Sequence, residues 1–144
     1  MSHSFEYLPE IAIADAAFVA RGSSLAELFT AAALATTGIM VELEDIRQTA
    51  ERQISLDADS REDLLYQWLS ELLYIKDVEY LVFRGFDLAV AEDSGRCRLS
   101  GTAFGERIDQ QRHRLGQDVK AVTYHLFEIK QDSGEFTARV VLDI

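Results

Sequence analysis

The feature that most constrains the fold is a broad apolar stripe near the middle of the chain. Apolar side chains recur there at helical spacing, at Leu64, Leu65, Trp68, Leu69, Leu72 and Leu73. Asp59 or Ser60 precedes the stripe as a helix cap, and acidic residues follow at the positive N-terminal end. The pattern predicts a helix from Arg61 to Leu73 or Ile75. A stripe this wide predicts the most deeply packed helix of the fold.

Another helix is predicted from Ser24 to about Thr37. Ser24 and Glu27 have the spacing of a capping box, in which a hydroxyl and a carboxylate satisfy free N–H groups at the helix start. Gly38 is placed to end the helix in a left-handed conformation. The apolar face of this helix comprises Leu25, Leu28, Phe29, Ala32 and Ala35.

The rest of the chain reads as strands joined by turns. Strands are predicted at 5–8, 16–21, 47–56, 79–83, 86–92, 96–104, 120–129 and 136–142. Arg84-Gly85, 93–95 and 132–134 are predicted hairpin loops, and the polar stretch 108–118 is a predicted exposed loop. Strands before, between and after two helices predict an α+β fold. We expect two helices packed on antiparallel or mixed β-sheet, in a single domain over residues 1–144.

Composition excludes several classes of protein. The chain has 144 residues and a net charge of −11, which argues against autonomous nucleic-acid binding. Its only cysteine, Cys97, excludes an internal disulfide and a cysteine-based zinc cluster. Neither a signal peptide nor an apolar run of membrane-spanning length occurs, so we expect a cytoplasmic protein that binds no membrane. The sequence also lacks a phosphate-binding glycine loop, a nucleophile elbow and a zinc-protease helix.

Few side chains remain as candidates for chemistry. Cys97 lies between Arg96 and Arg98, which would lower the pKa of a catalytic thiol, but a buried structural cysteine is the favoured interpretation. His125 alternates with apolar neighbours in a predicted strand, which favours a core-lining histidine over a general base. His113 lies in the polar loop and is expected to be solvated.

Asp143 is notable because only Ile144 follows it. The Asp143 carboxylate and the α-carboxylate of Ile144 could supply hard oxygen ligands to calcium or magnesium. Taken alone, these residues favour the alternative, an ordinary charge at a strand end.

Several strings closely resemble the archease family. The most specific are DLLYQWLSELLY at 63–74, VKAVTYH at 119–125 and VVLDI at 140–144. Others are FEYLP at 5–9, Ala14-Asp15, Phe18, GSSL at 22–25, AAA at 31–33 and Gly105-Glu106. The resemblance covers the whole chain in order.

The resemblance implies a small cytoplasmic protein cofactor of the RtcB-type tRNA-splicing ligase. That ligase joins RNA ends through guanylylation of its own histidine. The chain would promote this guanylylation, permit multiple turnovers and carry no covalent chemistry itself. The ligase would hold the RNA, so that this chain meets RNA only indirectly.

The resemblance also implies a divalent-metal site, formed here by Asp15, Asp143 and Ile144. Calcium is the expected ion, with magnesium or manganese as alternatives. Lys120 is the best candidate for an activity residue, because its ammonium could contact a nucleotide phosphate or an acidic ligase group. His125 and Glu10 are further candidates for partner binding or activity.

One departure from the family pattern affects this site. Archeases usually carry His-Thr-Ala-Asp directly after Leu-Pro, whereas this chain has PEIAIAD at 9–15. Ala12 and Ile13 then stand in place of the His and Thr that would orient the metal carboxylate. Weaker metal binding is expected, unless Glu10 compensates.

Two other functions are alternatives to the ligase cofactor. The first is a metal-dependent phosphoesterase using Asp15, Asp143 and His125, although the sequence shows no nucleophile paired with a base. The second is a general chaperone or interaction module, suggested by the acidic surface and apolar core.

Overall fold

The long apolar stripe forms helix α2 (Arg61–Glu79) in a computed structural model that describes residues 2–8 and 15–144. The Ser60 hydroxyl caps it by accepting a hydrogen bond from the Asp63 N–H at 3.0 Å. The helix continues to Glu79, about one turn beyond the predicted end at Leu73 or Ile75, and the buried Lys76 lies in this added turn. It ends at Tyr80, whose φ of 58° is left-handed.

Helix α1 (Leu25–Met40) begins at the predicted cap, with the Ser24 hydroxyl accepting a hydrogen bond from the Glu27 N–H at 3.1 Å. The other half of the predicted capping box is replaced, because the Glu27 carboxylate instead contacts the His3 ring at 2.8 Å. The prediction that Gly38 ends α1 is wrong, since the helix continues to Met40. A Cβ at Gly38 would lie 2.7 Å from the Tyr7 hydroxyl, so this glycine permits a close approach between helix and strand. Terminal helix carbonyls are instead satisfied by the distant loop 108–118, where the Gly116 N–H donates to the Met40 carbonyl at 2.8 Å.

One antiparallel sheet brings together strands from both ends of the chain. Its order is β1 (His3–Leu8), β2 (Asp15–Gly22), β8 (Glu135–Asp143) and β6 (Ala121–Val122), and β7 (Glu128–Asp132) also pairs with β8. The predicted strand over 120–129 is therefore wrong in its middle. A turn divides it, and Leu126 adopts a left-handed φ of 56° there.

The other sheet is formed by β3 (Ala50–Ala58), β5 (Arg96–Arg107) and β4 (Leu81–Asp93), in that order. The predicted hairpin at Arg84-Gly85 is wrong, because β4 runs through it with a shift of register. The other two predicted hairpin loops are confirmed, with left-handed pairs at Ser94-Gly95 and Ser133-Gly134. The short helix η1 (Leu43–Asp45) connects α1 to β3.

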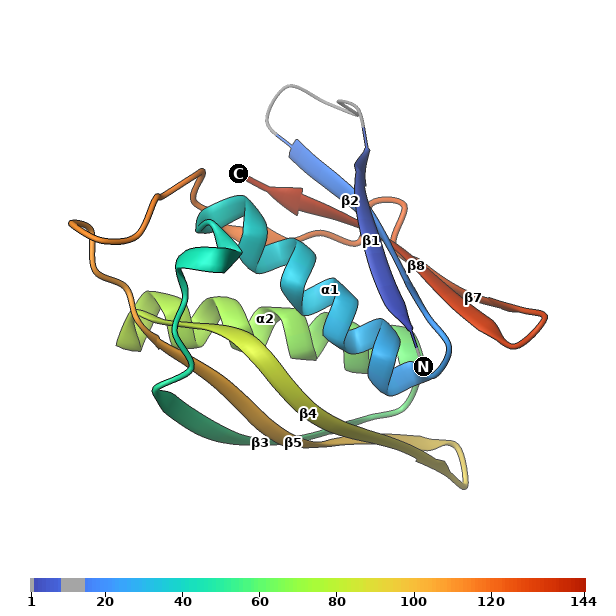
Figure 1. The fold of residues 1–144 in the computed structure, drawn as a ribbon. Coiled ribbons are helices and arrows are strands. Elements are labelled where there is room, and N and C mark those ends of the chain that lie inside the picture. The colour runs from blue at the N-terminus through green and yellow to red at the C-terminus, as the bar shows by residue number, and fades with distance from the viewer. Residues whose placement is uncertain (1, 9–14) are drawn as a thin grey trace.

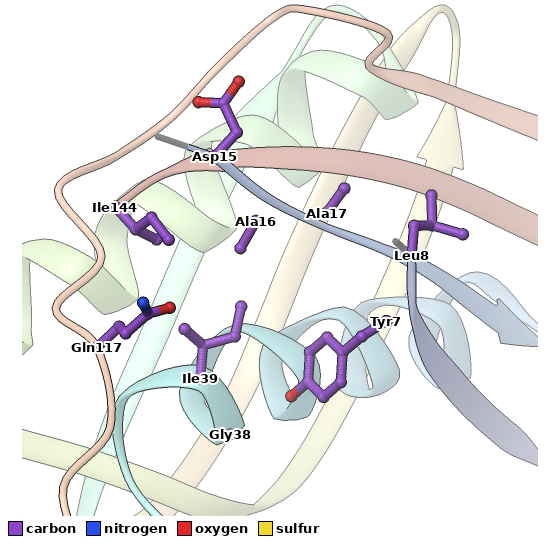
Figure 2. A pocket seen from close by; sticks show the side chains of 9 residues that line it. All are labelled: Tyr7, Leu8, Asp15, Ala16, Ala17, Gly38, Ile39, Gln117 and Ile144. Carbon is purple, nitrogen blue, oxygen red and sulfur yellow. The ribbon is translucent and has the colours of Figure 1, made fainter. Parts of the chain in front are cut away.

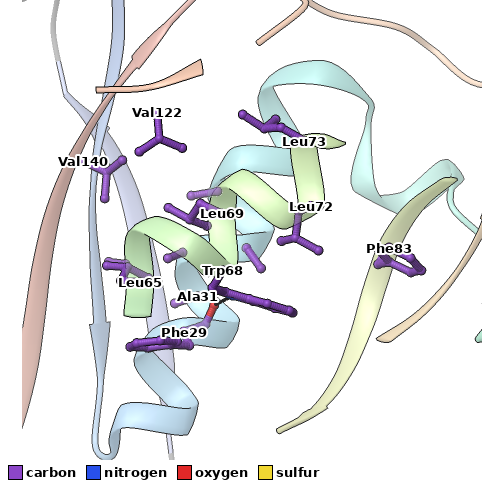
Figure 3. Packing of buried hydrophobic residues seen from close by; sticks show 14 of the residues in the cluster. Phe29, Ala31, Leu65, Trp68, Leu69, Leu72, Leu73, Phe83, Val122 and Val140 are labelled. Atoms are coloured by element: carbon purple, nitrogen blue, oxygen red, sulfur yellow. Dashed lines mark hydrogen bonds between the residues drawn. The ribbon is translucent and has the colours of Figure 1, made fainter. Parts of the chain in front are cut away.

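The two helices lie between the two sheets (Figure 1). Both helices contact both sheets, and a single cluster of buried apolar side chains joins all three layers. Trp68 of α2 is fully buried, and its indole N–H donates to the Phe29 carbonyl of α1 at 3.0 Å (Figure 3). The predicted α+β fold, with two helices on antiparallel sheet, is confirmed. No helix in the described ranges has both the length and the apolarity to cross a membrane.

Candidate functional site

The ladder between β2 and β8 places Asp15 directly opposite Asp143. Opposite residues of an antiparallel pair share one face of the sheet, with Cβ atoms about 4.5–5.5 Å apart. That face points away from the helices, because Leu142, the neighbour of Asp143, is fully buried on the helix side. The Asp15 side chain accordingly points to the opposite side of the strand from Ala16 (Figure 2). Two half-buried carboxylates are thus held side by side at the sheet edge.

No described Lys, Arg or His lies within ion-pair distance of either carboxylate. The Lys120 N–H donates to the main-chain carbonyl of Asp143 at 2.7 Å, which fixes Lys120 beside the pair and leaves its side chain exposed. Ile144 follows Asp143 and packs its half-buried side chain against the core. The structure therefore brings Asp15, Asp143, Ile144 and Lys120 to one place.

A surface cavity of about 360 Å³ lies beside this place (Figure 2). Its lining is mixed, with Ile39 and Ile144 as apolar members and Asp15, Tyr7 and Gln117 as polar ones. The Tyr7 hydroxyl donates to the Ala35 carbonyl at 2.8 Å. Burial, with a smaller contribution from Glu42, raises the pKa of Tyr7 to about 12. Tyr7 is therefore a neutral donor bound to α1 at any physiological pH.

Comparisons with known proteins show which family the chain belongs to. Residues 5–144 match the profile of the Archease protein family. The chain belongs to the archease family. It is 40% identical to protein archease of Methanothermobacter thermautotrophicus over 131 residues, which cover 91% of this chain and 93% of that protein. It is 38% identical to protein archease of Pyrococcus furiosus over 124 residues, 85% of this chain and 87% of that one.

Solved structures place this archease in the same fold. The solution structure of Methanobacterium thermoautotrophicum protein 1598 superposes with a TM-score of 0.84 at 39% identity, covering 97% of this chain and 98% of that one. A crystal structure from Thermotoga maritima, described as an archease and possible chaperone, gives a TM-score of 0.58 at 19% identity. It covers 95% of this chain and 96% of that one, and shows the fold alone.

Two of the three histidines of this archease, His113 and His125, have environments opposite to those predicted. His125 was predicted to line the core, but it is exposed in the turn after β6, and its N–H donates to the Thr123 hydroxyl at 3.3 Å. Within residues 2–8 and 15–144, no three His, Cys, Asp or Glu side chains gather at metal-binding distance. His125 therefore does not join the Asp15–Asp143 pair. Glu10, Ala12 and Ile13 lie outside the described residues.

His113 was predicted to be solvated, but it is only 4% exposed. The Asp109 N–H donates to its Nδ1 at 2.7 Å, so Nε2 carries the proton and donates to Glu106 at 3.0 Å. Glu106 also accepts hydrogen bonds from the Arg112 guanidinium and from the Arg47 N–H. Arg112, followed by the Arg47 and His113 hydrogen bonds, outweighs burial and lowers the Glu106 pKa to about 2.

Sequence reasoning missed this cluster, which anchors the loop 108–118 that precedes Lys120 in the chain. The sequence signal that could have indicated it is Glu106 near the end of a strand, followed within seven residues by Arg112 and His113. The loop is irregular, as predicted, but it is anchored at several points. Arg112 donates to the Asp45 carbonyl at 3.0 Å, and the buried Lys76 pairs with Asp118.

Cys97 is buried, as the structural interpretation requires. Burial and the neighbouring Glu92 raise the pKa of the thiol, so the lowering expected from Arg96 and Arg98 does not occur. The reason is strand alternation, because Cys97 faces the core while both arginines point the other way.

Proposed function

We propose that this chain is the protein cofactor of an RtcB-type tRNA-splicing ligase, promoting guanylylation of the ligase and its multiple turnover. Membership of the archease family supports the proposal. The observation that carries it is the register that sets Asp15 opposite Asp143, with Lys120 fixed alongside. An exposed lysine next to two uncompensated carboxylates can contact both a phosphate and a cationic or metal-bearing surface of a partner.

We further propose that Asp15, Asp143 and the main-chain carboxylate of Ile144 hold a divalent cation, with calcium expected and magnesium or manganese as alternatives. Their oxygens are the hard donors that these cations prefer. The absence of ion-pair partners within the described part of the chain leaves their charge available. When bound, the ion would supply positive charge and exchangeable coordination positions at the sheet edge.

In this proposal the residues of this chain contact the ligase and steer its approach, and the ligase itself carries out the covalent step. The net charge of −11 favours encounter with a basic partner, which is what an RNA-holding ligase presents. The buried Glu106–His113–Arg112 cluster and the Lys76–Asp118 pair keep the loop that leads to Lys120 in place.

Guanylylation of a cognate ligase, followed with labelled nucleotide and metal, tests the proposal. Wild-type protein should increase the rate of guanylylation. Asp15→Asn and Asp143→Asn should each remove most of that increase. Asp87→Asn is the matched control, because Asp87 is exposed on β4 in the other sheet. Lack of acceleration by folded wild-type protein would refute the cofactor role.

A chaperone-like role is the second candidate, favoured by the description of the Thermotoga maritima structure as a possible chaperone. Exposed Tyr74 and Val78 on one face of α2 give this candidate an apolar surface. Suppression of aggregation of several unrelated unfolded proteins would support it, whereas selective capture of the ligase supports the cofactor role.

A further inference from the structure

A stacked pair of tyrosines lies on the surface beside the turn after β6. The rings of Tyr66 and Tyr124 are 4.1 Å apart at their centroids with 4° between their planes. Phe127 meets both rings edge-on, at 6.0 Å and 6.1 Å. Tyr66 covers one face of the Tyr124 ring, yet Tyr124 remains 64% exposed. The other face of the Tyr124 ring is therefore open to solvent.

The turn that presents Tyr124 is held rigidly. The Thr123 hydroxyl donates to the Val141 carbonyl at 3.0 Å, and Arg139 Nε donates to the Leu126 carbonyl at 3.0 Å. Leu126 occupies the left-handed region at φ 56° and is still 42% exposed. A leucine disfavours that conformation, so surrounding contacts fix a shape that exposes apolar surface.

An acidic pocket of about 360 Å³ opens beside the stacked rings. Asp57 and Asp59 on its wall already hold the guanidinium of Arg96, with a 3.0 Å contact to Asp57. Asp63 also lines it, and within the described residues no cationic side chain pairs with this carboxylate. Three carboxylates against one guanidinium leave net negative charge, and the Arg96 contacts show that a guanidinium suits this wall.

We propose that this tyrosine pocket, formed by Asp57, Asp59, Asp63, Tyr66, Arg96 and Tyr124, docks an arginine side chain from a basic segment of a partner protein. The incoming guanidinium stacks on the open face of Tyr124 and pairs with Asp63. Arginine fits better than lysine because its planar group stacks on aromatic rings and binds carboxylates through two hydrogen bonds.

Charge complementarity selects this occupant over others. The net charge of −11 steers basic protein segments toward the chain, whereas the same carboxylates repel the phosphates of a nucleic acid. A second copy of this chain would bring its own negative charge to the pocket. The pocket shares no residue with the Asp15–Asp143 site, so its docking role stands apart from the ligase proposal.

Binding of a fluorescent peptide of alternating glycine and arginine, measured by anisotropy at low ionic strength, tests the inference. Tyr124→Ala and Asp63→Asn should each weaken binding about three- to fivefold. Tyr74→Ala and Asp87→Asn are matched controls, because both residues are exposed outside the pocket. Each control should change binding less than about twofold, and a lysine peptide should bind more weakly than the arginine peptide.

Equal losses in pocket and control variants, or no binding of the arginine peptide by folded wild-type protein, would overturn the inference. Binding of single-stranded polyuridine that requires Tyr124 would assign the pocket to nucleic acid instead. Dimerisation that requires Tyr124, seen by sedimentation without peptide, would assign it to a second copy. Asp63→Asn keeps the test decisive if Tyr124→Ala unfolds, because the exposed Asp63 side chain contributes nothing to the core.

Discussion

The substitution Glu106→Gln should destabilise the protein in a way that depends on pH. Glu106 is 8% exposed, and its carboxylate accepts hydrogen bonds from Arg112, His113 and the Arg47 N–H. Glutamine keeps the size of the side chain but removes the charge that these donors stabilise. One amide oxygen then replaces two carboxylate oxygens, so at least one of the three donors loses its acceptor.

The magnitude follows from the Glu106 pKa. Lowering it from the ordinary 4.5 to about 2 corresponds to about 3 kcal/mol of folding free energy at neutral pH. Because Arg112 is partly exposed, water screens the pair, and about 2 kcal/mol is the expected loss. A carboxylate with a depressed folded-state pKa stabilises the fold above pH 4.5 and loses that contribution as pH falls toward 2.

Urea denaturation of wild type and Glu106→Gln at a series of pH values measures this directly. The difference in unfolding free energy should be about 2 kcal/mol at pH 7 and should shrink steadily as pH falls below about 4.5. Glu51→Gln, an exposed carboxylate on β3, is the control and should leave stability unchanged within about 0.5 kcal/mol. A difference that stays constant with pH would refute the electrostatic explanation.

Three further predictions concern the packing of the fold and the proposed metal site. Gly105→Ala should cost more than about 3 kcal/mol in urea denaturation, because its Cβ would lie 1.8 Å from the Val82 carbonyl oxygen on the paired strand. Trp68→Phe should lower the free energy of unfolding by about 2–3 kcal/mol, since it removes the hydrogen bond to Phe29 and leaves a cavity. Calcium should raise the Tm of wild type, and chelator should reverse this; Asp143→Asn should abolish the response, and a wild-type Tm indifferent to calcium would contradict the metal proposal.

Local chemistry made much of the fold predictable. The Ser24 and Ser60 caps and the two serine–glycine turns depend only on neighbouring residues, and all of them form as expected. Gly38 was misread as a helix terminator and Gly85 as part of a hairpin loop, because at each position glycine allows the close approach of a residue distant in the sequence. A Cβ at Gly38 would strike Tyr7, and one at Gly85 would lie 2.2 Å from the Gln48 side chain.

The candidate site was only partly predictable for the same reason. The resemblance to archeases singled out Asp15 and Asp143, but their opposition depends on the β2–β8 register, which no local pattern fixes. The histidines were misassigned because the burial of each depends on remote partners. His113 is buried by Glu106, and the alternating sequence around His125 is interrupted by a turn that Arg139 and Val141 hold.

The pairing of β2 with β8 has a consequence for synthesis in the cell. Asp15 emerges from the ribosome early, whereas its ladder partner Asp143 is translated more than a hundred residues later. Contacts so distant in sequence are costly to close and form late in folding. The nascent chain can build the β4–β5 hairpin and its helices beforehand. It cannot bring Asp15 and Asp143 together until translation reaches β8. A translation product truncated before β8 would therefore lack the Asp15–Asp143 pair altogether.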